Sequence, residues 1–131
     1  MAHFKTLVSN IGATVDVFDD SVAAFNAQDP DIGRFFDDNV VLVTVKTHTA
    51  YTGKTNVVNY LKNTEWPNKP TFTPTTIQVT ESKSGTIALI SGTAGWKDND
   101  PGPDGPILYA FNLILKNGKW LISTLWGSAD S

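Results

Sequence analysis

The first hydrophobic pattern in the chain has the period of a helix. Between residues 4 and 27, apolar side chains recur every three or four positions and fall on one stripe about 80° wide. Thr14 and Ser21 are polar residues within this stripe, so their hydroxyls either bond to the preceding turn or face a cavity. We expect a long amphipathic helix whose stripe consists of Phe4, Leu7, Ile11, Val15, Phe18, Val22 and Phe25.

Two shorter helices are expected next. Asp29 can cap a second helix that has Pro30 at its first position, where the missing N–H costs nothing. Residues 55–63 have an apolar side of helical spacing and predict a third helix.

The remaining apolar segments have the character of strands, and residues 97–106 are too rich in Pro, Gly and Asp for anything but a loop. Helices first and strands last indicate a single α+β domain over residues 1–131, with helices on one face of a curved antiparallel sheet. Strands are predicted at residues 40–45, 75–81, 86–96 and 107–128, the last as a hairpin turning at Asn117-Gly118.

Both faces of this hairpin are apolar. A two-residue turn places Leu115 opposite Trp120, and an unbroken register then places Tyr109 opposite Trp126. We expect this large aromatic face to lie beneath the helices. The smaller face should join a second copy in a homodimer, although another part of the same chain is the alternative cover. The expected dimer face contains Ala110, Asn112, Leu121, Ser123 and Leu125.

Composition narrows the possible partners. The chain has 131 residues, a net charge of −3 and ten scattered Lys and Arg, so neither nucleic acid nor a membrane surface is an expected partner. Cysteine is absent and the histidines are only His3 and His48, so we expect no metal site. The chain has no signal-peptide pattern and no apolar run long enough to span a bilayer, so we expect a soluble cytoplasmic protein.

Several short motifs then occur in an informative order. Asp29 ends the first helix, Asp37-Asp38 precedes the first strand, Gly53 opens the third helix, and "NGKW" at 117–120 joins the last strands. This pattern resembles the nuclear transport factor two-like superfamily and, within it, the SnoaL-like proteins. The resemblance extends over almost the whole chain.

The resemblance implies a cone-shaped, cystatin-like α+β domain, usually dimeric, with a hydrophobic pocket between the helices and the sheet. Its members include ketosteroid isomerase, scytalone dehydratase, limonene epoxide hydrolase, polyketide cyclases and non-enzymatic scaffolds. The fold alone therefore does not determine the function.

The catalytic residues of these enzymes do not carry over to this chain. The positions of the isomerase's base, tyrosine and protonated Asp are held here by Val43, Ser21 and Phe111. The histidine pair of the dehydratase is absent, and Arg34, the only arginine, is expected on the second helix rather than in an epoxide hydrolase site. We therefore reject steroid isomerisation by the usual residues.

General acid–base chemistry requires a titratable group that points into the pocket. The sequence predicts no such carboxylate, because every acid is assigned to a helix surface, an element end or a loop, with Glu65 in a loop. His48 is then the best candidate base, and Asp19 is a second one should the first helix rotate.

Two functions remain open. The chain is either a cofactor-independent lyase, isomerase or cyclase acting on a small, apolar cyclic molecule, or a non-catalytic binding or dimeric scaffold protein with a filled pocket. Trp66, Trp96 and Trp126 either stack on a flat ligand or belong to the core and loops. The expected pocket-lining residues are Thr14, Phe18, Ser21, Tyr51, Tyr60, Tyr109, Phe111, Thr124 and Trp126.

Overall fold

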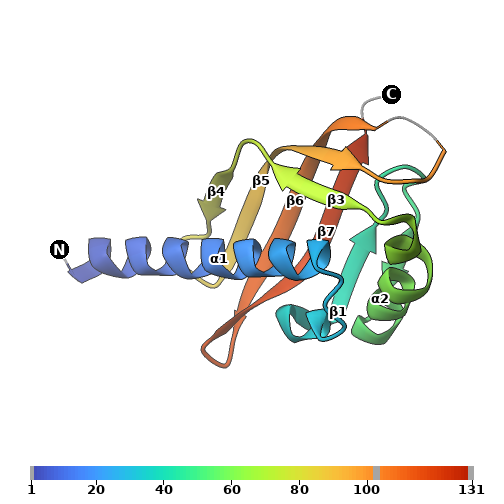
Figure 1. Ribbon diagram of the computed structural model, residues 1–131. Helices are drawn as coiled ribbons and strands as arrows, with labels where there is room; N and C mark the ends of the chain where they lie inside the picture. The colour runs from blue at the N-terminus through green and yellow to red at the C-terminus, as the bar shows by residue number, and fades with distance from the viewer. Residues whose placement is uncertain (1, 102–103, 130–131) are drawn as a thin grey trace.

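The computed structural model describes residues 2–101 and 104–129, and for residues 2–11 the backbone alone. A seven-stranded sheet forms one layer, and a long helix lies across one of its faces with a short helix beside it (Figure 1). The first part of the predicted helical stripe, Phe4, Leu7 and Ile11, lies outside the described side chains.

The long helix α1 extends over Ala2–Asn26, and the pattern predicted residues 4–27. Its buried positions from Thr14 onward, which include Phe18, Ser21 and Ala24, have the three- and four-residue spacing that turns one helix face to the sheet. Asn26 fixes the end of the helix, because its side chain makes hydrogen bonds of 2.9 Å to both the N–H and the C=O of Phe72.

The expected second helix is not an α-helix. Residues Ile32–Phe35 form one 3-10 turn, and β1 begins at the next residue, so the segment is too short for an α-helical turn. The described residues therefore contain two α-helices rather than three. The second one, α2 at Lys54–Tyr60, follows Gly53, which has a φ of 92° that favours glycine.

The sheet is mixed rather than purely antiparallel, because β1 pairs with β7 in parallel. Its order is β2-β1-β7-β6-β5-β3, and β4 also pairs with β5. Strands β2 and β3 were not predicted, since three or four residues are too few to distinguish a strand from a loop by alternation. The strands are β1 Phe36–Val43, β2 Ala50–Thr52, β3 Thr71–Pro74, β4 Gln78–Glu81, β5 Ile87–Lys97, β6 Gly105–Lys116 and β7 Lys119–Ala129.

The predicted turn of the C-terminal hairpin is confirmed. Asn117 and Gly118 have positive φ angles of 53° and 77°, as a type I′ turn requires. Next to the turn, the predicted register also holds, and Leu115 pairs with Trp120.

Farther along, the predicted register is wrong. Leu113 pairs with Ile122, but Asn112 pairs with Thr124, which leaves Ser123 as an extra residue in β7. This β-bulge moves every later pair by one position, so Trp126 faces Ala110 rather than Tyr109. An alternating pattern gives no sign of such an insertion.

The bulge also changes which face the end of β7 presents. In the parallel ladder, Leu125 lies beside Leu42, which is buried on the side of the sheet that faces the helices. Leu125 was expected on the dimer face, and that placement is wrong.

Four aromatic side chains fill much of the space between α1 and the sheet. Phe18 stacks on Tyr109 with ring centroids 5.4 Å apart and meets Phe111 edge-on at 5.1 Å. Phe72 meets Tyr109 edge-on at 5.3 Å. We call Phe18, Phe72, Tyr109 and Phe111 the aromatic cluster.

The loop after β3 closes over this cluster. The Tyr109 hydroxyl donates to the Thr76 carbonyl oxygen at 2.7 Å. A Cβ on Gly92 would lie 2.1 Å from the same oxygen, so only glycine permits this close approach.

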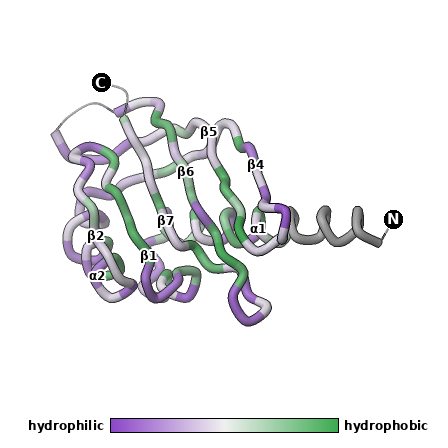
Figure 2. Tube along the Cα trace, turned by 180° about the vertical axis from the view of Figure 1, so that it is seen from behind, coloured by the Kyte–Doolittle hydropathy of each residue, from purple (hydrophilic) through white to green (hydrophobic). Residues whose placement is uncertain are grey.

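The opposite face of the sheet, which we call the outer face, is not covered by any described helix (Figure 2). It exposes large apolar side chains in neighbouring strands: Leu108 is 56%, Ile87 52% and Leu89 37% exposed. The sheet therefore has one face packed against helices and one apolar face open to its surroundings.

Candidate functional site

A cavity of about 80 Å³ lies beside the aromatic cluster. It has space for several water molecules, since one water needs about 10–15 Å³. Ser21 and Phe25 of α1 form one wall, and Leu42, Leu125 and Phe111 of the sheet form another. Most of the wall is apolar, so the cavity suits an apolar occupant.

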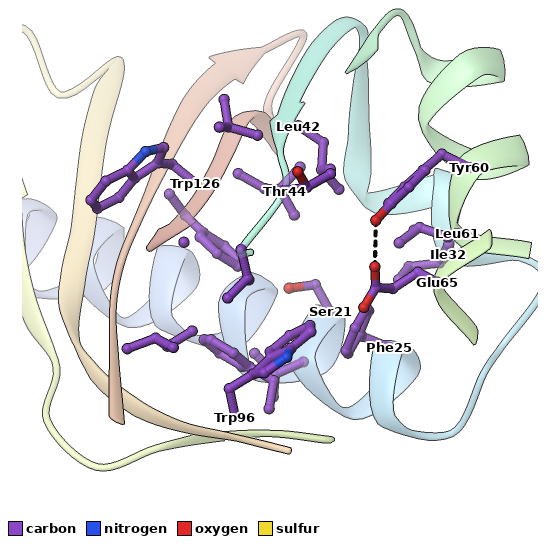
Figure 3. A pocket seen from close by; sticks show the side chains of 18 of the residues that line it. Ser21, Phe25, Ile32, Leu42, Thr44, Tyr60, Leu61, Glu65, Trp96 and Trp126 are labelled. Carbon is purple, nitrogen blue, oxygen red and sulfur yellow. Dashed lines mark hydrogen bonds between the residues drawn. The ribbon is translucent and has the colours of Figure 1, made fainter. Parts of the chain in front are cut away.

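One carboxylate interrupts this apolar wall. Glu65 lines the cavity, and its side chain reaches in beside that of Tyr60 (Figure 3). The sequence had placed Glu65 in a loop and predicted no inward carboxylate, and both predictions are wrong.

The backbone explains how Glu65 comes to face the cavity. Residues Leu61–Glu65 continue α2 as a π-helical turn, in which the N–H of Trp66 bonds to the carbonyl of Leu61, five residues earlier. In an α-helix, residues five apart point about 140° away from each other. The wider turn brings Tyr60 and Glu65 to the same side, and π turns of this kind are frequent at functional sites.

The Tyr60 hydroxyl donates a short hydrogen bond to Oε2 of Glu65. Burial raises the pKa of the Glu65 carboxyl, the bond from Tyr60 opposes that shift, and the charges of Asp98 and Asp100 raise it further. Burial, and then the bond to Glu65, also raise the pKa of Tyr60, which remains a proton donor. The pair therefore joins a neutral phenol to a carboxyl group that is harder to ionise than usual.

Tyr51 of β2 supports the phenol of Tyr60. The two rings stack with centroids 4.2 Å apart and planes at 26°. Such offset stacking contributes about 0.5–1.5 kcal/mol beyond the buried area. Tyr51 thereby restricts the ring that orients the Glu65 carboxyl.

A second polar network holds another wall of the cavity. The indole N–H of Trp96, a cavity-lining residue, donates to Oδ2 of Asp98 at 2.8 Å. Lys46 forms an ion pair with Oδ1 of Asp98 at 2.6 Å, and the Asp98 side chain is only 2% exposed. Lys46 also lies 3.7 Å from the Asp104 carboxylate, so a single lysine connects the loop after β5 to the turn after β1.

The structure brings together only some of the residues expected at the site. Ser21, Tyr60, Phe111 and Trp126 line the cavity, and Trp126 lies on the side away from Tyr60 and Glu65 (Figure 3). Ser21 also donates to the Phe18 carbonyl at 2.8 Å, so its hydroxyl both bonds to the preceding turn and faces a cavity, which were the two alternatives predicted from the sequence. The other expected pocket residues, Thr14, Phe18, Tyr51, Tyr109 and Thr124, are not part of the lining.

The two expected catalytic residues lie elsewhere. His48 is exposed in the turn after β1, where its Nε2 lies 3.1 Å from the Ser128 hydroxyl. Asp19 is exposed on α1. Neither lines the cavity, so Glu65 takes their place as the candidate base.

Pro67 is the sequence signal that could have indicated Glu65. Proline has no N–H, and its ring clashes with the carbonyl four residues earlier, here that of Asn63. The helix before Pro67 must therefore end or widen, and widening returns a carboxylate to the side of Tyr60. For metals, the described residues contain no group of three or more His, Asp or Glu side chains placed to hold an ion.

Comparison with solved structures identifies the fold. A candidate ketosteroid isomerase from Shewanella frigidimarina superposes with a TM-score of 0.74 at 20% identity, over 88% of this chain and 94% of that one. An NTF2-like protein of unknown function from Pseudomonas putida gives a TM-score of 0.77 at 15% identity, over 91% and 85%. The chain has the nuclear transport factor two-like fold.

A third solved structure that superposes on this chain is that of a dehydrochlorinase. The hexachlorocyclohexane dehydrochlorinase LinA-type3 from Novosphingobium barchaimii has a TM-score of 0.72 at 19% identity, over 92% of this chain and 86% of that one. No protein-family model and no curated protein matches the sequence. Within the described residues, no helix combines the length and apolar character that a membrane span requires.

Proposed function

We propose that this protein binds a small apolar molecule in its cavity and that Glu65 accepts a proton from that molecule. The proposal depends on one observation above all, a partly buried carboxyl group in an otherwise largely apolar wall. Burial makes a carboxylate a stronger base than it is in water, and general bases work best when their pKa lies near the working pH.

The two oxygens of Glu65 have different roles in this proposal. Oε2 accepts the hydrogen bond from Tyr60, and Oε1 has no hydrogen-bond partner among the described residues. We assign proton transfer to Oε1. The substrate's C–H proton passes to this oxygen, and the bonding electron pair stays on the substrate.

Where the electron pair goes next distinguishes an isomerase from a lyase. An isomerase returns the proton to another carbon, whereas a lyase lets the electron pair expel a leaving group. Neither reaction consumes an oxidant or a cofactor. Two structural relatives are named isomerase and dehydrochlorinase, which supports chemistry of this class.

The cavity volume limits the substrate to a small molecule. The 80 Å³ of free space is smaller than the roughly 150 Å³ cavity that takes benzene, so a single small ring is the upper limit, and the aromatic cluster occupies the room that a steroid would need. We therefore propose a compact cyclic substrate rather than a polycyclic one.

Hydrogen exchange would test this function without knowledge of the natural substrate. Cyclohexanone in D₂O is followed by NMR with wild type, Glu65→Gln and His48→Ala. We expect wild type and His48→Ala to exchange the protons beside the carbonyl at equal rates, and Glu65→Gln to be slower by about 10²-fold or more. Equal rates for Glu65→Gln and wild type would remove Glu65 from the reaction.

A non-catalytic binding protein is the second candidate. It is favoured by the hydrogen bond that already engages one oxygen of Glu65 and by the small size of the cavity. Saturable binding of cyclohexanone without any enzyme-dependent exchange would support this candidate instead.

We also propose that the outer face joins a second copy of the chain. Leu108, Ile87 and Leu89 are exposed there in adjacent strands, and exposed apolar patches commonly mark interfaces. Sedimentation should then give a dimer for wild type and a monomer for Leu108→Glu. A wild-type protein that stays monomeric at high concentration contradicts this proposal.

A further inference from the structure

The cavity wall carries charge of only one sign. Among the described residues, Glu65 is the only charged side chain in the lining, which contains no Lys, Arg or His. Much of the remaining wall is aromatic, with Phe25, Tyr60 and Trp96 on the side near the carboxyl group. An occupant therefore meets one acidic group and several π faces.

The surroundings of Glu65 are acidic as well. Asp98 and Asp100 both act electrostatically on its carboxyl group. Lys46, the cation that opposes them, is bound to Asp98 at 2.6 Å and lies 3.4 Å from the Asp100 carbonyl oxygen. Its charge is thus already shared among acidic partners and is poorly placed to hold an anionic ligand.

We infer that this cavity selects its ligand by charge, taking small apolar amines in preference to neutral molecules of the same shape and excluding organic acids. The inference rests on the proposed binding function and deepens it, because it names the class of ligand that the same site prefers. An amine presents the hydrogens of its ammonium group to Oε1 of Glu65, which for such a ligand is an ion-pair partner and not the acceptor of a C–H proton.

Physical chemistry favours this order of affinity. A hydrogen bond between an ammonium group and a carboxylate is roughly twice as strong as one between neutral groups. Aromatic faces add a cation–π attraction that is larger in a desolvated site. A carboxylate ligand would bury a second negative charge beside Glu65 without a cation, and that is strongly unfavourable.

The preference should depend on pH in a definite direction. The titratable and charged groups that act on Glu65 are Tyr60, Asp98, Asp100 and Lys46. As the pH falls through the raised pKa of Glu65, the carboxylate becomes neutral and the ion pair with an ammonium is lost. Amine binding should therefore weaken on acidification, while binding of an organic acid should improve.

Three ligands with one ring and a one-carbon head group provide the test. Benzylamine, benzyl alcohol and benzoate are titrated near neutral pH, and binding is measured by calorimetry and by tryptophan fluorescence. We expect benzylamine to bind about tenfold or more tightly than benzyl alcohol, and benzoate not to bind measurably.

Two variants test whether Glu65 is the source of the preference for the amine over the alcohol. In Glu65→Gln, which keeps the side-chain shape and an acceptor for Tyr60, amine and alcohol should bind equally. In Asp100→Asn, which removes only a more distant charge, most of the preference should remain. Circular dichroism and thermal melting establish that both variants are folded.

The outcomes separate this inference from the proposed function. Binding of benzyl alcohol tests whether the cavity takes a small apolar molecule at all. Equal affinities for the alcohol and the amine in wild type overturn the charge selection and leave the proposed function standing. Tight binding of benzoate likewise overturns the inference, and failure of all three ligands to bind overturns both proposals.

Discussion

The aromatic cluster and the cavity share one layer between α1 and the sheet, but they differ in what the chain places there. In the cluster, the Phe18 and Tyr109 rings lie 5.4 Å apart and leave no space. A few residues along α1, the small side chain of Ser21 faces a hollow that ends at Glu65. Helix α1 thus contributes to the packed core through Phe18 and to the wall of the cavity through Ser21.

Loss of a cluster residue should have the largest effect on stability. Phe18 is fully buried, so Phe18→Ala should lower the free energy of unfolding by about 3–5 kcal/mol. Urea denaturation measures the change. Phe25→Ala, at the edge of the cavity and only partly buried, is the matched control and should cost less. Equal losses would mean that the two regions do not differ in packing.

Breaking the network behind the cavity wall should have the next largest effect. Asp98→Asn removes the carboxylate that bonds Lys46 and Trp96, and hydrogen bonds to charged groups contribute about 1.5–3 kcal/mol. We expect a loss of about 2–3 kcal/mol in the free energy of unfolding, together with weaker binding of benzyl alcohol. Unchanged stability and binding would show that the network does not hold the wall.

A larger side chain should lower the free energy of unfolding in the filled region and raise it in the hollow region. Ala88 is 1% exposed in the filled part of the sheet, and Ala88→Leu should destabilise by about 1–3 kcal/mol through overpacking. Ser21→Leu places its added carbons in the hollow and should stabilise by about 1 kcal/mol while preventing ligand binding. Chemical denaturation and calorimetry check both variants. Destabilisation by Ser21→Leu would argue against free space at that position.

The smallest expected effect concerns Glu65 and pH. Because burial raises its pKa in the folded state, the folded protein retains this proton to a higher pH than the unfolded chain does. The contribution of Glu65 to stability is therefore fully present below the unfolded pKa and is lost as the pH rises through the folded one. Wild type should lose stability relative to Glu65→Gln as the pH increases through that range. A constant difference between the two would mean that the carboxyl group is not desolvated.

Much of the fold was predictable because it depends on periodicity and turn chemistry. The turn at residues 117–118 needs two positive φ angles, and an Asn-Gly pair predicts them because these two residues adopt positive φ most readily. The register beyond Ser123 was not predictable, because an unpaired residue leaves no mark on an alternating pattern.

The site was harder to predict for a similar reason. Glu65 reaches the cavity only because the helix widens before Pro67, and an analysis at 3.6 residues per turn points the same side chain elsewhere. The catalytic candidate thus depends on an irregular turn. His48 is the base that the sequence predicts, because the regular elements place no acid toward the cavity.

The bulge at Ser123 also matters for how the chain reaches its native state. The sequence of residues 105–129 is compatible with two hairpin registers, and the unbroken one would pair Trp126 with Tyr109 instead of Ala110. Only the bulged register aligns Leu125 with Leu42 of β1, more than eighty positions earlier in the chain. The turn sets the pairing next to residues 117 and 118, whereas the bulged pairing of the far half is the one that fits beside β1. The alignment of β7 therefore depends on a strand that lies far from it in the sequence.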